Sequence, residues 1–156
     1  MKKGIGDIRK ISKKEYIYMA NENKKVWKFG SRWSDEGDPK TKIADSIFKK
    51  YNIAFANTNA VLDIVEKDLV AIGDGHNIIA IGEVTSPPCQ INQFGIACAE
   101  SDIKYFLGAG NVCGCTVRYF WLDKKDQFVY VKAGRFFHAT NIEEQVNQLF
   151  NKLNQE

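Results

Sequence analysis

The chain has 156 residues and a formal net charge of +3, and 44% of its residues are hydrophobic while 26% are charged. This length and composition are typical of one soluble globular domain with a core that needs no metal or disulfide staple. No stretch reaches the roughly 18 apolar residues that span a bilayer, and the mild basic excess permits a phosphate-bearing partner without requiring one.

The N-terminus predicts a cytoplasmic protein. Residues 1–14 are rich in lysine and lack the apolar segment of a signal peptide, so we expect a flexible basic arm followed by a single domain over residues 15–156. Cytoplasmic cysteines remain reduced thiols. We expect this state for all four cysteines, which are Cys89, Cys98, Cys113 and Cys115.

Short strands are predicted in the N-terminal half of the chain. Residues 16–19 alternate weakly and predict an edge strand or a short helix, and residues 26–29 predict a strand. Two glycines, a proline and several Ser and Asp residues make 30–40 a loop. A further strand is expected over 52–56, followed by a short helix or turn over 61–65.

One helix is predicted between these strands. Asp38 followed by Pro39 is typical of a helix start, with Asp38 as the N-cap. Apolar residues then fall on one helical face, so we expect a helix over 39–50 that packs against the sheet. These residues are Ile43, Ala44, Ile47, Phe48 and Tyr51.

The segment 67–84 predicts a β-hairpin at the centre of the fold. Asp74-Gly75 between two β-branched runs is a strong hairpin signal, because a type I′ turn needs positive φ at both central residues. Both arms are almost continuously apolar rather than alternating, so both faces of the hairpin should be covered.

The C-terminal half begins with a segment, 90–110, that has no clean period. A long strand is predicted over 111–122, a return strand over 127–132 and a short strand over 135–138. Thr140 and Glu143 form a capping box before apolar residues at helical spacing, which predicts a C-terminal helix. Together these elements indicate an α+β fold, a mostly antiparallel small β-barrel with two or three flanking helices.

Sequence motifs favour a binding protein over an enzyme. Gly73-Asp74-Gly75 lies in a hairpin turn, not between a strand and a helix, so it is no phosphate-binding loop. The cysteine spacings depart from zinc-site pairs and favour small buried side chains, and we expect no metal and no cofactor. His76 and His138 lie in a hairpin tip and a strand, where neither pairs obviously with a nucleophile.

An aromatic and basic constellation is the candidate site. Trp33 sits in a polar loop beside Ser31 and Arg32, where a large ring has no local core to fill. Aromatic rings with short polar side chains can hold an extruded base. A structural role, in which Trp33 folds the loop over the sheet, is an equal alternative. Candidate phosphate contacts, besides Arg32, are Lys28, Lys40, Lys42, Arg118 and Arg135.

The order of these elements resembles the EVE-like members of the PUA-like superfamily, whose modules read altered bases in modification-dependent restriction systems. The residues that carry the resemblance are Lys67-Asp68-Leu69-Val70 and Ile79-Ala80-Ile81-Gly82-Glu83-Val84, where Lys67 and Ala80 replace glycines usual in the family. The resemblance implies a pocket between barrel and helices. Its lining would be Trp33, Phe55, Asp74 or Ser86, and Trp121.

The first hypothesis is therefore a non-catalytic nucleic-acid-binding domain, with DNA favoured over RNA, that reads a modified or flipped base and acts through a separate effector protein. It predicts that Trp33→Ala abolishes binding with little change in melting temperature. A small-molecule or nucleotide-binding protein of bacterial defence or counter-defence is one alternative. A protein-interaction module using the C-terminal helix is another.

Overall fold

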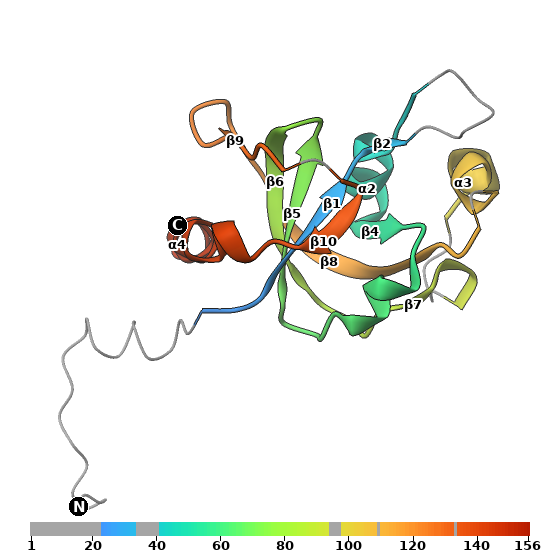
Figure 1. Cartoon of the computed structure of the whole chain (residues 1–156), viewed down its shortest axis with the longest axis horizontal. Helices are drawn as coiled ribbons and strands as arrows, with labels where there is room; N and C mark the ends of the chain where they lie inside the picture. Colours follow the sequence, from blue (N-terminus) through green and yellow to red (C-terminus); the bar gives the residue numbers. More distant parts are fainter. Residues whose placement is uncertain (1–22, 34–40, 94–97, 109, 133) are drawn as a thin grey trace, which may run out of the picture.

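The computed structural model describes residues 23–33, 41–93, 98–108, 110–132 and 134–156 (Figure 1). Several predictions lie outside these residues. They are the arm at 1–14, the element at 16–19, the helix start at Asp38-Pro39 and the phosphate contact Lys40.

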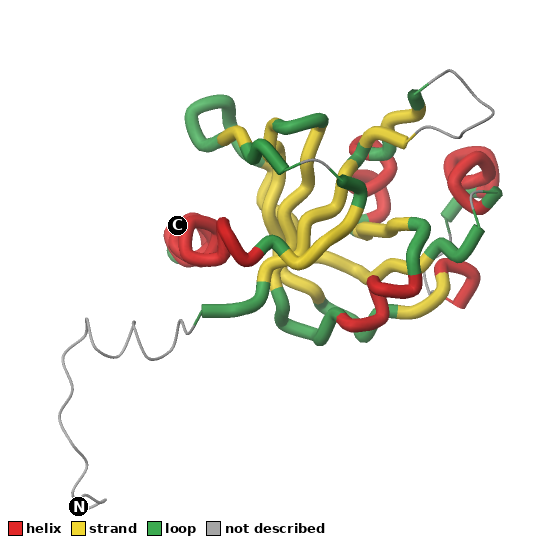
Figure 2. The backbone as a smooth tube through the Cα atoms, viewed as in Figure 1, coloured by secondary structure: helices red, strands yellow, loops and turns green. Residues whose placement is uncertain are grey.

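A curled, mostly antiparallel sheet forms the body of the protein (Figure 2). Its order is β10-β1-β5-β6-β8-β4. The bounds are β1 (Val26–Gly30), β4 (Ile53–Ala56), β5 (Leu69–Asp74), β6 (Asn77–Val84), β8 (Cys113–Trp121) and β10 (Phe136–His138). The α+β class and the predominance of antiparallel pairing are confirmed, although β1 and β5 pair in parallel.

Two smaller strands extend this sheet, and two others pair with each other. β7 (Cys89–Gln90) pairs with β8, β9 (Phe128–Val129) pairs with β6, and β2 (Arg32–Trp33) pairs with β3 (Lys42–Ile43) in a separate ribbon. Within the described residues the ladder order is open, with β10 and β4 at its two ends, so the sheet is a half-barrel where the sequence predicted a barrel. The strand predicted over 127–132 is shorter in the structure, where β9 covers Phe128–Val129.

The central position of the 67–84 hairpin is confirmed. β5 and β6 occupy the middle of the sheet, and alternate residues of both strands enter cores on opposite faces. The turn lies one residue later than predicted, because Asp74 pairs with Asn77 and leaves Gly75-His76 as the two-residue loop. Positive φ is confined to Gly75, at 63°, so the expected type I′ geometry is wrong.

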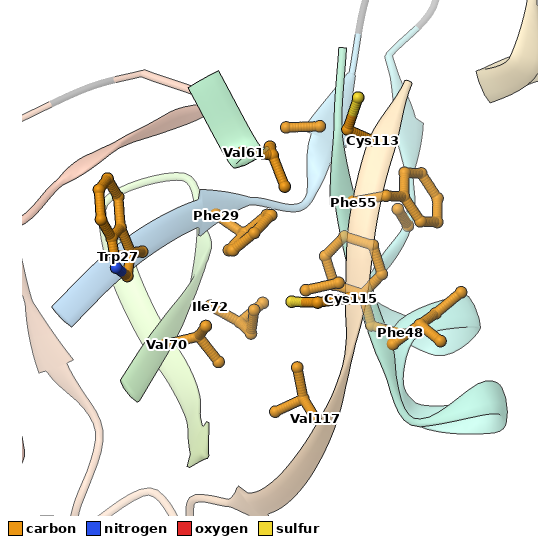
Figure 3. Close-up of a cluster of buried hydrophobic side chains, with 14 of the residues drawn as sticks. Trp27, Phe29, Phe48, Phe55, Val61, Val70, Ile72, Cys113, Cys115 and Val117 are labelled. Carbon is orange, nitrogen blue, oxygen red and sulfur yellow. The ribbon is translucent and has the colours of Figure 1, made fainter. Parts of the chain in front are cut away.

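Two hydrophobic cores cover the two faces of the sheet. The concave core gathers residues of β1, β4, β5 and β8 with Phe48 of the helix α2 (Asp45–Tyr51), as Figure 3 shows. The outer core lies beneath α4 (Glu143–Asn154), which Figure 1 shows on the side of the sheet opposite to α2 and α3 (Glu100–Leu107). In the part of the chain that the structure describes, no helix is long and apolar enough to cross a membrane.

The helix α2 begins later than the sequence predicted. Lys42–Ile43 are extended because they pair with Arg32–Trp33, and the helix starts only at Asp45. Backbone pairing between β2 and β3 thus overrides the helical spacing of the apolar residues. The helix ends at Asn52, whose φ of 54° is the left-handed conformation that Asn tolerates.

Further helical segments complete the fold. The 3₁₀ turn η1 (Asn59–Asp63) confirms the short helix or turn predicted over 61–65. Segment 90–110, which showed no period, contains the 3₁₀ turn η2 (Ile91–Gln93) and the helix α3. The predicted C-terminal helix is confirmed as α4, but the prediction of a capping box at its start is wrong.

A 3₁₀ turn, η3 (Thr140–Ile142), precedes α4 where the sequence predicted a capping box. The carboxylate of Glu143 accepts a hydrogen bond from Val26 N (3.3 Å) and lies 2.5 Å from His138 Nε2. The Glu143 carboxylate therefore links α4 to the strands β1 and β10 and does not cap its own helix.

Asn147 joins α4 to the chain that enters β1. Its Oδ1 accepts from Lys24 N at 2.8 Å, and its Nδ2 donates to Lys24 O at 2.9 Å and Glu143 O at 2.7 Å. Asn147→Ala leaves the backbone groups of Lys24, a half-buried residue, without these partners, so we expect a loss of about 1–3 kcal/mol in the free energy of unfolding.

Urea denaturation checks this loss. Asn154→Ala, on an exposed turn of the same helix, is the control and should cost well under half as much. Equal losses for the two variants would contradict the bridging role of Asn147.

Candidate functional site

Five cations lie at one end of the sheet, beside the β5–β6 turn. We call Lys28, Arg32, Lys42, Lys132 and Arg135 the basic cluster. Long-range pairing assembles it, because β1 lies between β5 and β10 and brings residues 28–32, 73–75 and 134–135 together. Figure 1 shows β2, the β5–β6 turn and the chain leading into β10 at this same end.

Ser31 and Gly30 hold the backbone of this end in place. Ser31 donates two hydrogen bonds to Gly73 O, from its backbone N at 2.8 Å and its Oγ at 2.9 Å. Gly30 N donates to Arg135 O at 2.6 Å, and a Cβ on Gly30 would lie 3.2 Å from the Arg135 Cα. Ser31 is fully buried. Its hydroxyl donates to a backbone carbonyl and is not accessible to a ligand.

Lys28 is a buried cation with a backbone partner. Its residue is 3% exposed, and its Nζ donates to Gly134 O at 2.7 Å. The side chain passes over Gly73, where a Cβ would meet the Lys28 Cε at 2.7 Å. Burial lowers the pKa of Lys28. Within the described residues no carboxylate pairs with its ammonium group, so an anion nearby would be stabilised by its charge.

Lys28 and Lys132 share one aromatic ring. The Nζ atoms lie 5.6 Å and 4.5 Å from the centroid of Phe137, which β10 places next to Lys28. The ring attracts both cations and offsets part of their mutual repulsion. Lys132 is exposed and is therefore available to a partner.

Arg32 forms an ion pair with Asp74 at the hairpin turn. Half of the Arg32 side chain and a third of that of Asp74 are exposed, so the pair contributes little stability. Asp74 thus neutralises one charge of the basic cluster. Asp74 and Arg32, both predicted as site residues, are therefore in contact in the structure.

Trp33 fills a core, and the expectation that it has no local core is wrong. It is 1% exposed and meets Phe55 and Phe106 edge-on, at centroid distances of 5.5 Å and 5.1 Å. The guanidinium of Arg135 lies 4.9 Å from its ring centroid. With these neighbours the ring has no free face on which a base could stack.

Lys42 is the member of the basic cluster that lies at its margin, and Ser86 lies apart from the cluster. Lys42 pairs with Trp33 across the β2–β3 ribbon, and its ammonium lies 5.3 Å from the Tyr105 ring. Ser86 accepts hydrogen bonds from Thr116 at 3.2 Å (N) and 2.7 Å (Oγ1), away from the other site residues.

Two further predicted residues contact other groups. Trp121 packs beside Tyr119, with the Lys49 ammonium 5.6 Å from its ring. Arg118 contacts Glu83 at 3.4 Å and Asn154 at 3.0 Å on the face beneath α4. The structure therefore gathers Lys28, Arg32, Lys42, Asp74 and Arg135 and leaves Ser86, Trp121 and Arg118 elsewhere.

Lys132 belongs to the cluster but was missed by sequence reasoning. The signal was present in the run Lys132-Ala133-Gly134-Arg135, two cations around a glycine that leads into a strand. Gly134 has a φ of 141°, which favours glycine, and its carbonyl is the partner of Lys28.

The cysteines do not present reactive thiolates. Burial raises the pKa of Cys115 to about 12 and also raises those of Cys89, Cys98 and Cys113, so these thiols stay protonated at neutral pH. Across the described ranges, no three His, Cys, Asp or Glu side chains gather in a way that could hold a metal ion.

No protein-family model, curated protein or solved structure matches this chain.

Proposed function

We propose that the protein binds nucleic acid through the basic cluster. The observation that carries the proposal is the convergence of five cations from β1, β2, β3 and the segment before β10, among which Arg32 is paired with Asp74. A row of Lys and Arg side chains is what a phosphodiester backbone requires, because each phosphate carries one negative charge.

Three features of the cluster support this proposal. Lys132 and Arg32 are exposed, while Lys28 is buried and shares the Phe137 ring with Lys132. The cations lie against the rings of Phe137, Trp33 and Tyr105, which hold the long side chains in place before a ligand arrives. Ordered side chains lose less entropy on binding.

The finer parts of the proposal extend from the same site. We propose a PUA-like domain whose half-barrel presents the bound strand, without catalysis, to a separate effector protein, and we favour DNA over RNA. The central hairpin, with covered faces and the sequence that carries the resemblance, supports this assignment.

Charge-neutralising variants test the proposal. We expect Arg32→Gln/Lys132→Gln to weaken oligonucleotide binding at least about 10-fold at low salt, because two phosphate contacts are lost. The matched control is Lys25→Gln/Lys67→Gln, which removes two exposed charges at the opposite end of β1 and β5 and should leave affinity within about twofold.

Fluorescence anisotropy measures these affinities against single- and double-stranded oligonucleotides, with and without modified cytosine or adenine. Preference for one modified duplex supports base reading. Equal weakening by both double variants would contradict a role for the basic cluster. Absence of binding across the panel would contradict nucleic-acid binding itself and favour a small-molecule ligand.

A further inference from the structure

The strand β9 has an open edge. Tyr130 N donates to His76 O at 2.7 Å, which joins this segment to β6 on one side. In an antiparallel ladder, neighbouring residues direct their backbone groups alternately toward and away from the partner strand. The N–H and C=O groups of Val129 therefore point away from β6, and within the described residues the backbones of Val129 and Val131 make no hydrogen bond. Figure 1 shows β9 and its loop projecting from the body of the protein beside β6.

Two valine side chains accompany this open edge. Val129 is 68% exposed and Val131 is 80% exposed, and among the large hydrophobic side chains of the described residues these two are the most exposed. Tyr130 between them is buried against Phe137, with a centroid distance of 5.7 Å, so the segment is anchored from one face. Neither a proline nor a charge interrupts Phe128-Val129-Tyr130-Val131, the devices that commonly protect a strand edge from pairing.

Exposed cations flank the edge at both ends. Lys124-Lys125 precede β9 and Lys132 follows it, and all three residues are exposed. Two carboxylates lie in the same stretch, of which Asp126 is 3.8 Å from Lys152 Nζ and Asp123 is exposed. Positive charge is therefore in excess around the edge, which favours a partner that carries acidic residues.

We propose that β9 is a docking edge for an extended acidic segment of a partner protein, which adds to the sheet as a further strand. The partner backbone accepts from Val129 N and donates to Val129 O, and its alternate side chains cover Val129 and Val131. Acidic residues at the ends of the segment face Lys124-Lys125 and Lys132. The inference goes beyond nucleic-acid binding and stands without it.

A second copy of this chain fits the edge less well than an extended segment. Antiparallel pairing of two β9 strands about Tyr130 would bring the Lys132 end of each copy toward Lys124-Lys125 of the other, so that like charges meet. A specific interface between two folded copies also needs about 1,000 Å² of buried surface, more than the edge of so short a strand offers. An extended segment reaches the edge without a second folded body.

Fluorescence anisotropy with the full chain tests the inference. The probe is a labelled synthetic peptide, capped at both ends, in which valine and threonine alternate between flanking glutamates. We expect this peptide to bind, and we expect the same peptide with lysines in place of the glutamates to bind at least about 10-fold more weakly. Equal affinities of the two peptides, or no binding of the acidic one at about 1 mM, would overturn the inference.

Val129→Pro tests the backbone contribution. The Val129 N–H points away from β6, and proline is tolerated on an edge strand where the N–H faces solvent, so the variant should keep its fold. The ring removes the outward donor and blocks an incoming strand, so we expect the acidic peptide to bind at least about 10-fold more weakly. Unchanged affinity of this variant would contradict strand addition at β9.

Val129→Glu/Val131→Glu tests the same edge without proline. Both side chains are exposed, so the variant should fold, and the added negative charges should weaken binding of the acidic peptide at least about 10-fold. Leu62→Glu/Val65→Glu is the matched control, because it makes the same change in charge at two other exposed apolar residues and should leave affinity within about twofold. Equal weakening by the two double variants would show that net charge, and not the β9 edge, controls binding.

A ¹H–¹⁵N correlation spectrum locates the bound peptide. The amide signals of Val129 and Val131 should move downfield on addition of the acidic peptide, as amides do when they form hydrogen bonds. The Tyr130 amide, which already donates to His76 O, should move less. If the peptide binds and the two valine amides do not move, the docking edge is wrong. If they move when the concentration of the chain alone is raised, the occupant is a second copy and the acidic partner is wrong.

Discussion

Trp33→Ala should lower the free energy of unfolding by about 3–5 kcal/mol, the range for a fully buried Trp or Phe cut to Ala. The ring is 1% exposed and meets Phe55, Phe106 and Arg135, so its removal opens a cavity where β2, β4 and α3 meet. This expectation replaces the one from sequence, in which the melting temperature was nearly unchanged. For a chain of this size the loss corresponds to a melting temperature about 6–20 °C lower.

Urea denaturation measures this loss, with Trp121→Ala as the control. Trp121 is partly exposed at the end of β8, so its truncation leaves a site open to water and should cost clearly less than that of Trp33. Equal losses at the two tryptophans, or a loss below about 1 kcal/mol at Trp33, would contradict the core position of Trp33.

Gly82→Ala should be among the most damaging single-methyl changes in the protein. Gly82 lies in β6 opposite Tyr119, and a Cβ there would come within 2.5 Å of the Val117 Cγ1 and 2.7 Å of the Arg118 carbonyl oxygen. The oxygen belongs to the backbone of the neighbouring central strand and cannot rotate away. We expect a loss at or above the upper end of the roughly 1–3 kcal/mol typical of overpacked cores.

Gly108→Ala is the matched control for this change. It adds the same methyl group at the end of α3, where the nearest atom, Tyr105 O, would be 3.5 Å away at an ordinary van der Waals distance. We expect its midpoint of urea denaturation to stay close to that of the wild type. A Gly82→Ala variant as stable as Gly108→Ala would show that β6 and β8 do not pack as closely as described.

The central hairpin could be predicted because its signals are local. Two apolar runs flank a short polar turn, and their continuous hydrophobicity correctly indicates that both faces are covered. The error of one residue at the turn arises because Asp74 stays in the ladder with Asn77 and Gly75 takes the positive φ. Local patterns thus identify the hairpin more accurately than the register of its turn.

The surroundings of Trp33 could not be predicted, because they come from distant segments. Phe106 lies on α3, a helix whose N-cap residue, Ala99, makes no side-chain hydrogen bond to the helix and so gives no start signal in the sequence. Without α3, Trp33 looks like an aromatic residue in a polar loop. The same limitation applies to Lys42, which pairs with Trp33 in a ribbon that competes with the predicted helix.

The burial of Lys28 also could not be predicted from the sequence. In the run Val26–Gly30 it alternates with Trp27 and Phe29, which predicts an exposed position. In the structure β10 pairs with β1 and places Phe137 beside it, and Gly134 supplies the acceptor for its ammonium group. Only the long-range pairing of these strands brings the basic cluster together.

The salt dependence of oligonucleotide binding tests the central proposal most directly. The logarithm of the association constant should fall linearly with the logarithm of salt concentration, and each lost phosphate contact should reduce the slope by about 0.7 for single strands and 0.9 for duplexes. We expect Arg32→Gln/Lys132→Gln to reduce the slope by about 1.4–1.8, twice that amount, and Lys25→Gln/Lys67→Gln to leave it unchanged. Identical slopes for the wild type and both variants would contradict phosphate binding by the basic cluster.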